Sequence, residues 1–197
     1  MYQAINYGLN LAKTDWIGYL NSDDLLHKDC LKELIEFGNS EKADFVYGMC
    51  DYIDLDGRYL YSFYPPSPRH LISIMRTRTL GMSQQTAIFR QDLYKKLNGF
   101  DTTYRYSADY DFFSRAVTSN SRFSCFYKFP VACFRLHHSQ LSRIRYDELI
   151  SEGDHILSKV FGKPKFRDNF ILVAWRLKNL PNYISRFFRL TQFNDLI

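Results

Sequence analysis

The chain has 197 residues, 46% of them hydrophobic and 17% aromatic, which suffices for the core of about one domain and excludes a disordered protein. Its formal net charge of +5 resides in residues 163–197, which carry seven basic and two acidic side chains. The remaining residues are neutral overall, so we expect no nucleic-acid-binding face and a distinct carboxy-terminal unit.

The first third of the chain is predicted to alternate between helix and strand. Apolar side chains recur at helical spacing over residues 2–12 and again over residues 27–40. Between them, the run Trp16–Leu20 is apolar on both faces, which is typical of a strand covered on each side. Residues 43–54 and 58–64 are then predicted to pair as a hairpin through a glycine-containing turn.

The alternation continues after a proline-rich stretch at residues 65–68, which predicts a loop. A strand is expected over residues 84–90 and a helix over residues 91–97. A further helix is expected over residues 107–119 and a strand over residues 123–136. Because strands and helices alternate without an internal repeat, the sequence predicts an α/β fold.

The carboxy-terminal segment predicts a basic amphipathic helix, with a kink at Pro181. Two interpretations stay open. The helix packs on the rest of the protein, or it lies on an anionic membrane surface through residues 170–190. The apolar side of this helix is formed by Leu177, Leu180, Ile184, Phe187 and Phe188.

The four cysteines suggest neither a metal site nor a disulfide framework. They contain no CxxC pair and no ligand-like spacing with the five histidines. No signal-peptide pattern is visible, and no apolar run reaches the roughly 18 residues of a membrane span. We therefore expect a cytoplasmic protein, with any membrane contact peripheral and at the inner face.

Two adjacent carboxylates, Asp23 and Asp24, directly follow the predicted strand Trp16–Leu20. One interpretation is a turn or helix cap, in which aspartate accepts backbone N–H bonds. The other is a site for Mg²⁺ or Mn²⁺, because oxygen ligands at the edge of an open α/β sheet hold such ions together with diphosphate oxygens.

A second acidic cluster lies at Asp109 and Asp111. Asp111 and Arg115 are four residues apart on the predicted helix and are expected to form a surface ion pair. Asp109 has no such partner and is followed by Phe112 and Phe113. A carboxylate beside aromatic rings suits a general base, because partial desolvation raises its pKa.

Three segments in order, "NYGLNLAKTDWIGYLNSDD", "QQTAIFRQDLYKKLNGFD" and "SADYDFFSR", resemble a family 2 glycosyltransferase with the GT-A fold. The resemblance covers about residues 2–142. It implies a mixed sheet flanked by helices, with residues 1–160 as the carboxy-terminal part of a catalytic domain and residues 161–197 as a helical tail. Relatives begin with a nucleotide-binding half that this sequence lacks, so we expect an amino-terminally truncated domain with an exposed sheet edge.

The resemblance also assigns roles by position. Asp24 resembles the main ligand of a DxD-type metal motif, with Asp23 on the metal or nucleotide and Asn6 on the nucleotide side. Asp109 resembles the catalytic base, although Ala108 replaces the glutamate that relatives carry before it. Both His137 and His138 follow the last core strand, where the resemblance implies that one of them approaches the metal or the diphosphate, with His138 chosen as the metal ligand. The other interpretation is that both are ordinary polar residues of a loop. The acceptor side is expected to comprise Gly99, Phe100, Asp101 and Asp111.

The function implied is an inverting, metal-dependent transfer of a sugar from a nucleotide-diphospho-sugar to a glycan or lipid-linked acceptor in cell-surface polysaccharide synthesis. The alternative is a non-catalytic domain that binds an acceptor or a partner chain. A metal-dependent phosphohydrolase is disfavoured, because the sequence offers too few clustered ligands for two metals.

Overall fold

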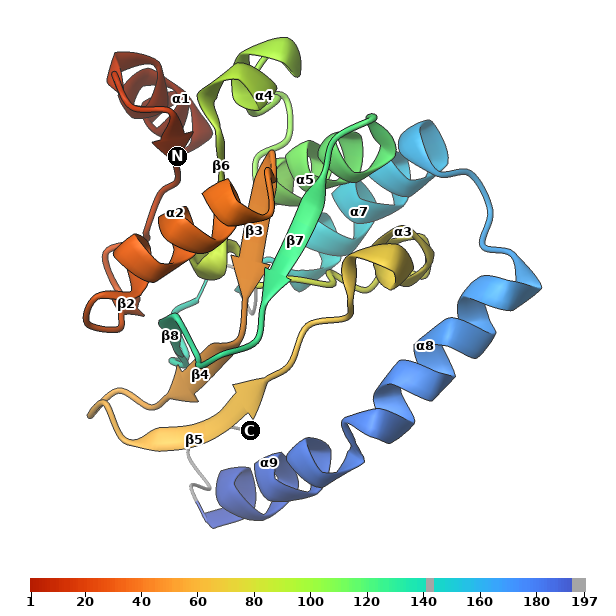
Figure 1. Cartoon of the computed structure of the whole chain (residues 1–197). Coiled ribbons are helices and arrows are strands. Elements are labelled where there is room, and N and C mark those ends of the chain that lie inside the picture. The colour runs from red at the N-terminus through yellow and green to blue at the C-terminus, as the bar shows by residue number, and fades with distance from the viewer. Residues whose placement is uncertain (141–143, 193–197) are drawn as a thin grey trace.

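The computed structural model describes residues 1–140 and 144–192, without the side chains of residues 186 and 189–192. In this part of the chain, helices and strands alternate as expected (Figure 1). The helices are α1 (Tyr2–Leu11), α2 (Cys30–Ser40), α3 (Pro68–Met75), η1 (Gln84–Thr86, a 3₁₀ turn), α4 (Gln91–Lys96), α5 (Ala108–Thr118), α7 (Tyr146–Val160), α8 (Phe166–Lys178) and α9 (Leu180–Gln192). The strands are β1 (Trp16–Ile17), β2 (Leu25–Leu26), β3 (Phe45–Gly48), β4 (Cys50–Ile53), β5 (Tyr59–Phe63), β6 (Ile88–Arg90), β7 (Phe123–Phe126) and β8 (Ala132–Arg135).

The strands of the described residues form two four-stranded sheets. The first has the order β1-β6-β3-β7 and the second the order β2-β8-β4-β5. Both are mixed, because β3 pairs parallel to β7 and β4 parallel to β8, while the other pairs are antiparallel. The hairpin of β4 and β5 is confirmed.

Two predicted strands each divide into two. Residues 43–54 form β3 and then β4, and residues 123–136 form β7 and then β8, so each segment passes from the first sheet into the second. Gly48 permits the crossing, because a Cβ there would lie only 3.2 Å from the side chain of Val131. Periodicity along the sequence does not reveal this change of partners.

Both faces of the first sheet are covered. In β3, Phe45 and Tyr47 face a core shared with α5, whereas Val46 faces a second core shared with α2. The rings of Phe45 and Phe89 stack with centroids 5.6 Å apart. This confirms the expectation of buried strands, although the first strand is shorter than predicted and ends at Ile17.

Four features differ from the sequence prediction. The proline-rich region continues into α3, where Pro68 occupies the first turn, a position that needs no N–H donor. Residues 25–26 form the short strand β2, and α7 packs against α5. The kink expected at Pro181 is a break between two helices, because α8 ends at Lys178 and the next residue, the buried Asn179, caps it.

The last two helices run along one side of the molecule, α8 against α3 and α9 against β5 (Figure 1). Asp168 of α8 is buried and its Oδ2 lies 3.0 Å from Nη1 of Arg76. The opposite face of α8 is exposed at Phe166, Phe170 and Val173. Among the described helices, none has the length and apolar character needed to cross a bilayer.

Candidate functional site

A cavity of about 780 Å³ brings the two acidic clusters of the sequence onto one surface. Asp23 and Asp109 both line it. Its walls include aromatic side chains from different elements, among them Tyr19, Tyr52 and Phe134. Carboxylates on a partly aromatic wall suit a polar ligand with apolar faces, such as a sugar or a nucleotide.

Asp23 reaches the cavity and pairs with a histidine from the segment after β8. Its Oδ2 lies 2.9 Å from Nε2 of His137. The Asp23 side chain is 41% exposed and that of His137 16% exposed. Nδ1 of His137 lies 2.8 Å from Oγ of Ser139, which fixes the ring, whereas the next residue, His138, is exposed.

Asp24 points into the protein. Its Oδ1 accepts the backbone N–H of Arg135 at 3.0 Å, and its Oδ2 accepts a long hydrogen bond from Nδ2 of Asn21 at 3.5 Å. Burial raises the pKa of Asp24 to about 6, although the Arg135 N–H opposes the shift. Asp24 does not line the cavity, so the two adjacent carboxylates have different environments.

Two long-range side chains hold the loop that carries these carboxylates. Arg135 donates from Nε to the carbonyl of Asp23 and from Nη1 to the carbonyls of Asp54 and Leu55. Gln84 donates from Nε2 to the carbonyl of Tyr19 at 2.6 Å. Sequence reasoning missed both residues, because neither belongs to a motif near residues 19–24.

Asp109 lies at the start of α5, as the sequence predicted. Its Oδ1 accepts the hydroxyl of Tyr2 at 3.2 Å and the backbone N–H of Tyr110 at 2.8 Å. Burial raises the pKa of Asp109, and the charge of Glu152 adds to the increase, while the two hydrogen bonds lower it. The aromatic rings beside it are tyrosines of the cavity, since Phe112 and Phe113 point into the core.

Glu152 of α7 fixes the approach to α5. Its two carboxylate oxygens accept three consecutive backbone N–H groups, of Arg105, Tyr106 and Ser107, at 2.8–2.9 Å. A carboxylate at the amino-terminal end of a helix satisfies unpaired donors and complements the helix dipole. Because α7 was not predicted, this contact could not be expected from sequence patterns.

Asn6 of α1 holds the turn at residues 98–100 through its side-chain amide. Its Nδ2 donates to the carbonyl of Phe100 at 2.8 Å, and its Oδ1 accepts the N–H of Phe100 and the hydroxyl of Tyr94. Gly99 in this turn has φ +66, and a Cβ there would lie 2.8 Å from the Tyr94 hydroxyl. Asn6 therefore has its amide groups occupied by the protein, and Phe100 is buried.

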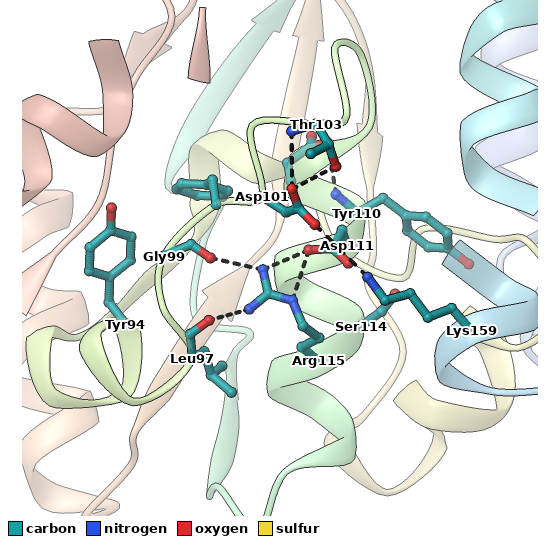
Figure 2. A network of polar contacts seen from close by, with 12 residues as sticks. Tyr94, Leu97, Gly99, Asp101, Thr103, Tyr110, Asp111, Ser114, Arg115 and Lys159 are labelled. Atoms are coloured by element: carbon teal, nitrogen blue, oxygen red, sulfur yellow. Dashed lines mark hydrogen bonds and ion pairs between the residues drawn. The ribbon is translucent and has the colours of Figure 1, made fainter. Parts of the chain in front are cut away.

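Figure 2 shows how Asp111 and Arg115 support the same turn. The ion pair expected between them forms, with Nη2 2.6 Å from Oδ2, but it lies inside the protein, because the Asp111 side chain is 0% exposed. The Arg115 guanidinium also donates to the carbonyl of Gly99 at 2.8 Å. Asp101 accepts the N–H and hydroxyl of Thr103.

The residues assigned by resemblance thus divide into two groups. Asp23 and Asp109 line the cavity, and His137 is in contact with Asp23. The others named as site residues are not among its lining residues, namely Asn6, Asp24, Gly99, Phe100, Asp101, Asp111 and His138.

Comparison with known proteins gives a consistent picture. Residues 1–98 match the family described as Glycosyl transferase family 2. The chain is 26% identical over 191 residues to the PGL/p-HBAD biosynthesis glycosyltransferase of Mycobacterium bovis, covering 94% of this chain and 67% of that protein. It is 24% identical over 196 residues to an uncharacterized glycosyltransferase of Rickettsia typhi, covering 94% of this chain and 59% of that protein.

The fold is similar to that of S. aureus TarS. The match to a crystal structure of TarS residues 1–349 has a TM-score of 0.55 at 16% identity and covers 94% of this chain and 58% of that one. A structure of the same protein with UDP gives a TM-score of 0.54 and covers 89% of this chain and 50% of that one. The predicted α/β fold of the GT-A type is therefore confirmed, and this chain spans just over half of that structure.

Proposed function

Residues 1–98 place the chain in glycosyl transferase family 2, and on this premise we propose that it forms part of an enzyme that transfers a sugar from a nucleotide-diphospho-sugar to a glycan or lipid-linked acceptor. The observation that carries the proposal is the common cavity of Asp23 and Asp109. It supports one carboxylate serving the donor and the other the acceptor. S. aureus TarS has been crystallised with UDP, so uridine diphosphate donors are the first to test.

The donor side of the proposed site consists of Asp23 and His137. A carboxylate oxygen and an imidazole nitrogen 2.9 Å apart beside the cavity can occupy two coordination positions of one divalent ion. The imidazole ligand suits Mn²⁺ better than Mg²⁺. When bound, such an ion offsets the negative charge that develops on the diphosphate leaving group. We assign the main ligand role to Asp23 and His137 rather than to Asp24 and His138. The Asp24 oxygens already accept protein donors. Of the two histidines, His137 contacts the cavity residue Asp23, whereas His138 is exposed.

On the acceptor side, Asp109 accepts the proton of the attacking hydroxyl. A bond forms between that oxygen and the anomeric carbon while the bond from the anomeric carbon to the diphosphate oxygen breaks. A single displacement of this kind inverts the anomeric centre. The raised pKa of Asp109 makes it a stronger base than an exposed aspartate, and the Tyr2 hydroxyl orients it.

The polar residues around the turn at Gly99 have a supporting role in this proposal. Asn6, Asp111 and Arg115 fix the segment that leads from α4 to α5, and Asp109 is the second residue of α5. The acceptor-side assignment of Gly99, Phe100, Asp101 and Asp111 is therefore replaced by one of positioning. The acceptor itself is proposed to contact the cavity wall near Tyr106 and Tyr110.

We also propose a peripheral membrane contact through residues 170–190, on the cytoplasmic face of the bilayer. The exposed stripe of α8 contains Phe170, Val173 and Leu177, and the neighbouring Lys178 is exposed as well. An apolar stripe beside basic residues suits an anionic lipid surface, where a lipid-linked acceptor would reside. In this proposal residues 161–197 form a tail, and its described helices α8 and α9 also pack on α3 and β5 through their other face.

The test is thermal stabilisation of the purified chain by a panel of nucleoside diphosphates, with and without Mn²⁺. Stabilisation by one nucleotide that needs Mn²⁺ and is lost in Asp23→Asn, but kept in Asp24→Asn, supports the donor site. Loss in Asp24→Asn alone would contradict the assignment of Asp23. A folded chain that responds to no nucleotide would favour the non-catalytic alternative.

A further inference from the structure

A second group of ligand-type side chains lies on the other face of the second sheet. In the parallel pair of β4 and β8, Asp51 is directly opposite Cys133. The next residues along these strands, Tyr52 and Phe134, line the cavity. Because side chains alternate along a strand, Asp51 and Cys133 point away from it. His27, which follows β2, joins them.

The three ligand atoms are close together. Nε2 of His27 lies 3.1 Å from Oδ2 of Asp51 and 3.3 Å from Sγ of Cys133, and all three atoms lie within 4.8 Å of one another. Ligand atoms of a tetrahedral zinc site are separated by about 3.3 to 3.8 Å, given metal–ligand distances of about 2.0 to 2.3 Å. The observed spacing therefore matches a tetrahedral zinc site to within a few tenths of an ångström for the two contacts of His27.

We propose that His27, Asp51 and Cys133 bind one Zn²⁺ ion, with water as the fourth ligand. Thiolate, imidazole and carboxylate together favour zinc over Mg²⁺ or Mn²⁺, which prefer oxygen. The Cys133 thiol releases its proton to solvent when the ion binds.

The surroundings of the three side chains support the site. Ser62 donates from Oγ to Oδ1 of Asp51 at 2.6 Å, which leaves Oδ2 directed at His27. Outer hydrogen bonds of this kind orient metal ligands. The His27 side chain is 40% exposed, so an ion has an entry path from solvent. Backbone geometry also holds His27 in place, since its N–H donates to the carbonyl of Val131 at 3.0 Å.

The proposed zinc site connects three strands of the second sheet. Its three ligands come from β4, β8 and the residue after β2. β2 directly follows Asp23 and Asp24. Arg135, which lies two positions after Cys133 in β8, donates hydrogen bonds to both of these residues. A bound ion would therefore fix the strands behind the loop that carries the cavity carboxylates, without entering the cavity.

The experiment is a titration of the purified full chain with Zn²⁺, followed by metal analysis after gel filtration. Titration with Co²⁺ adds a thiolate-to-cobalt absorption band that reports directly on cysteine ligation. We expect one ion per chain. In Cys133→Ser the absorption band should be lost and zinc affinity should fall at least about tenfold. Zinc affinity should also fall at least about tenfold in His27→Gln.

Matched variants separate this site from other cysteines and from the cavity. Cys125→Ser removes a thiol that is as buried as Cys133, both being 8% exposed, and should leave the Co²⁺ band unchanged. Asp23→Asn should also leave it unchanged. If Cys133→Ser fails to fold, His27→Gln still decides the matter, because that side chain is partly exposed. Absence of zinc from the folded chain, or an unchanged affinity in His27→Gln, would overturn the proposal.

Discussion

The imidazole of His137 and the carboxylate of Asp23 are 114 positions apart in the sequence, yet their Nε2 and Oδ2 atoms lie 2.9 Å from each other. The contact joins the loop after β1 to the segment after β8. It also distinguishes two adjacent histidines, because His137 is half-buried against Asp23, whereas His138 is exposed.

We expect His137→Gln to weaken Mn²⁺-dependent nucleotide binding by about tenfold or more, because it removes one of two proposed protein ligands. His138→Gln is the matched control and should bind as the wild type does. The measurement is calorimetric titration with UDP at saturating Mn²⁺. Equal loss in both variants would mean that the pair with Asp23 does not determine binding.

The ionisation of Asp109 should respond to Tyr2. Burial raises the pKa of this carboxyl, so the base form is populated only above a pH higher than usual for aspartate. The Tyr2 hydroxyl donates to the carboxylate and opposes that shift. Tyr2→Phe should therefore raise the pKa of Asp109 further and move the acidic limb of the pH–rate profile of kcat/KM to higher pH.

Carbon-13 NMR titration of the Asp109 carboxyl measures this change without a substrate. Tyr7→Phe, at an exposed tyrosine of the same helix, is the control and should leave the titration unchanged. A downward shift in Tyr2→Phe would show that the hydrogen bond does not favour the ionised form.

Asp111→Ala should lower the free energy of unfolding rather than weaken the binding of a particular ligand. It leaves the Arg115 guanidinium without its buried partner, a change that typically costs about 3 to 5 kcal/mol. Asp101→Ala removes the local bonds to Thr103 and a partly exposed ion pair with Lys159 at 3.9 Å, and should cost only about 1 kcal/mol. Urea unfolding followed by circular dichroism compares the two, and similar losses would contradict a buried pair that supports the turn at Gly99.

The contact between α8 and α3 should depend on pH through Asp168. Burial raises the pKa of this carboxyl, but bonds from Lys165, Ser73 and Arg76 outweigh it, so its net pKa is lowered. A lowered folded-state pKa contributes stability that is present above the unfolded value, near 4, and is lost as pH falls through the folded value.

The protection of the α8 amides against hydrogen exchange, measured as the exchange rate relative to the intrinsic rate at each pH, should therefore decrease in acid. Asp168→Asn should show fast exchange already at neutral pH. Asp147→Asn, at an exposed position of α7, serves as the control. Slow exchange of α8 in Asp168→Asn would mean that its apolar contacts, such as Trp175 with Phe63, are sufficient.

The proposed membrane contact predicts binding to anionic vesicles that decreases with salt. Replacing Phe170 and Leu177 together by serine should reduce co-sedimentation with phosphatidylglycerol vesicles several-fold, because both side chains are exposed apolar groups of α8. Tyr7→Ser, an exposed aromatic on α1, provides the comparison. Unchanged sedimentation of the α8 variant would argue for an interaction with another protein.

Part of the order of helices and strands was predictable, such as α1, α2, α4 and α5, because these helices show periodicity within short windows. The helices α3 and α7 and the strand β2 were not predicted. The acidic clusters were also predictable from short windows, and the turn of Asn98 and Gly99 has the positive φ angles expected of those residues. What could not be predicted is which neighbour faces the cavity. Asp24 turns inward because Arg135, 111 positions away, donates to it.

The cluster of His27, Asp51 and Cys133 was hidden for a similar reason. Spacing rules for metal ligands look for pairs within one turn or hairpin, whereas these residues come from three strands or strand ends. Only the register of β4 against β8 places Asp51 beside Cys133. The ion pair of Asp111 with Arg115 followed from helical spacing, but its burial depended on the packing of the segment from Leu97 to Gly99.

The passage of two neighbouring segments from one sheet into the other has a mechanical consequence. Residues 45–53 and 123–135 run side by side in the same direction through both sheets. A twist of one sheet against the other would have to shear both segments at once, at Met49 and Val131, whose backbone groups are themselves hydrogen-bonded. Within the described residues the two crossings are thus tied to each other, so we expect the two sheets to move as one unit.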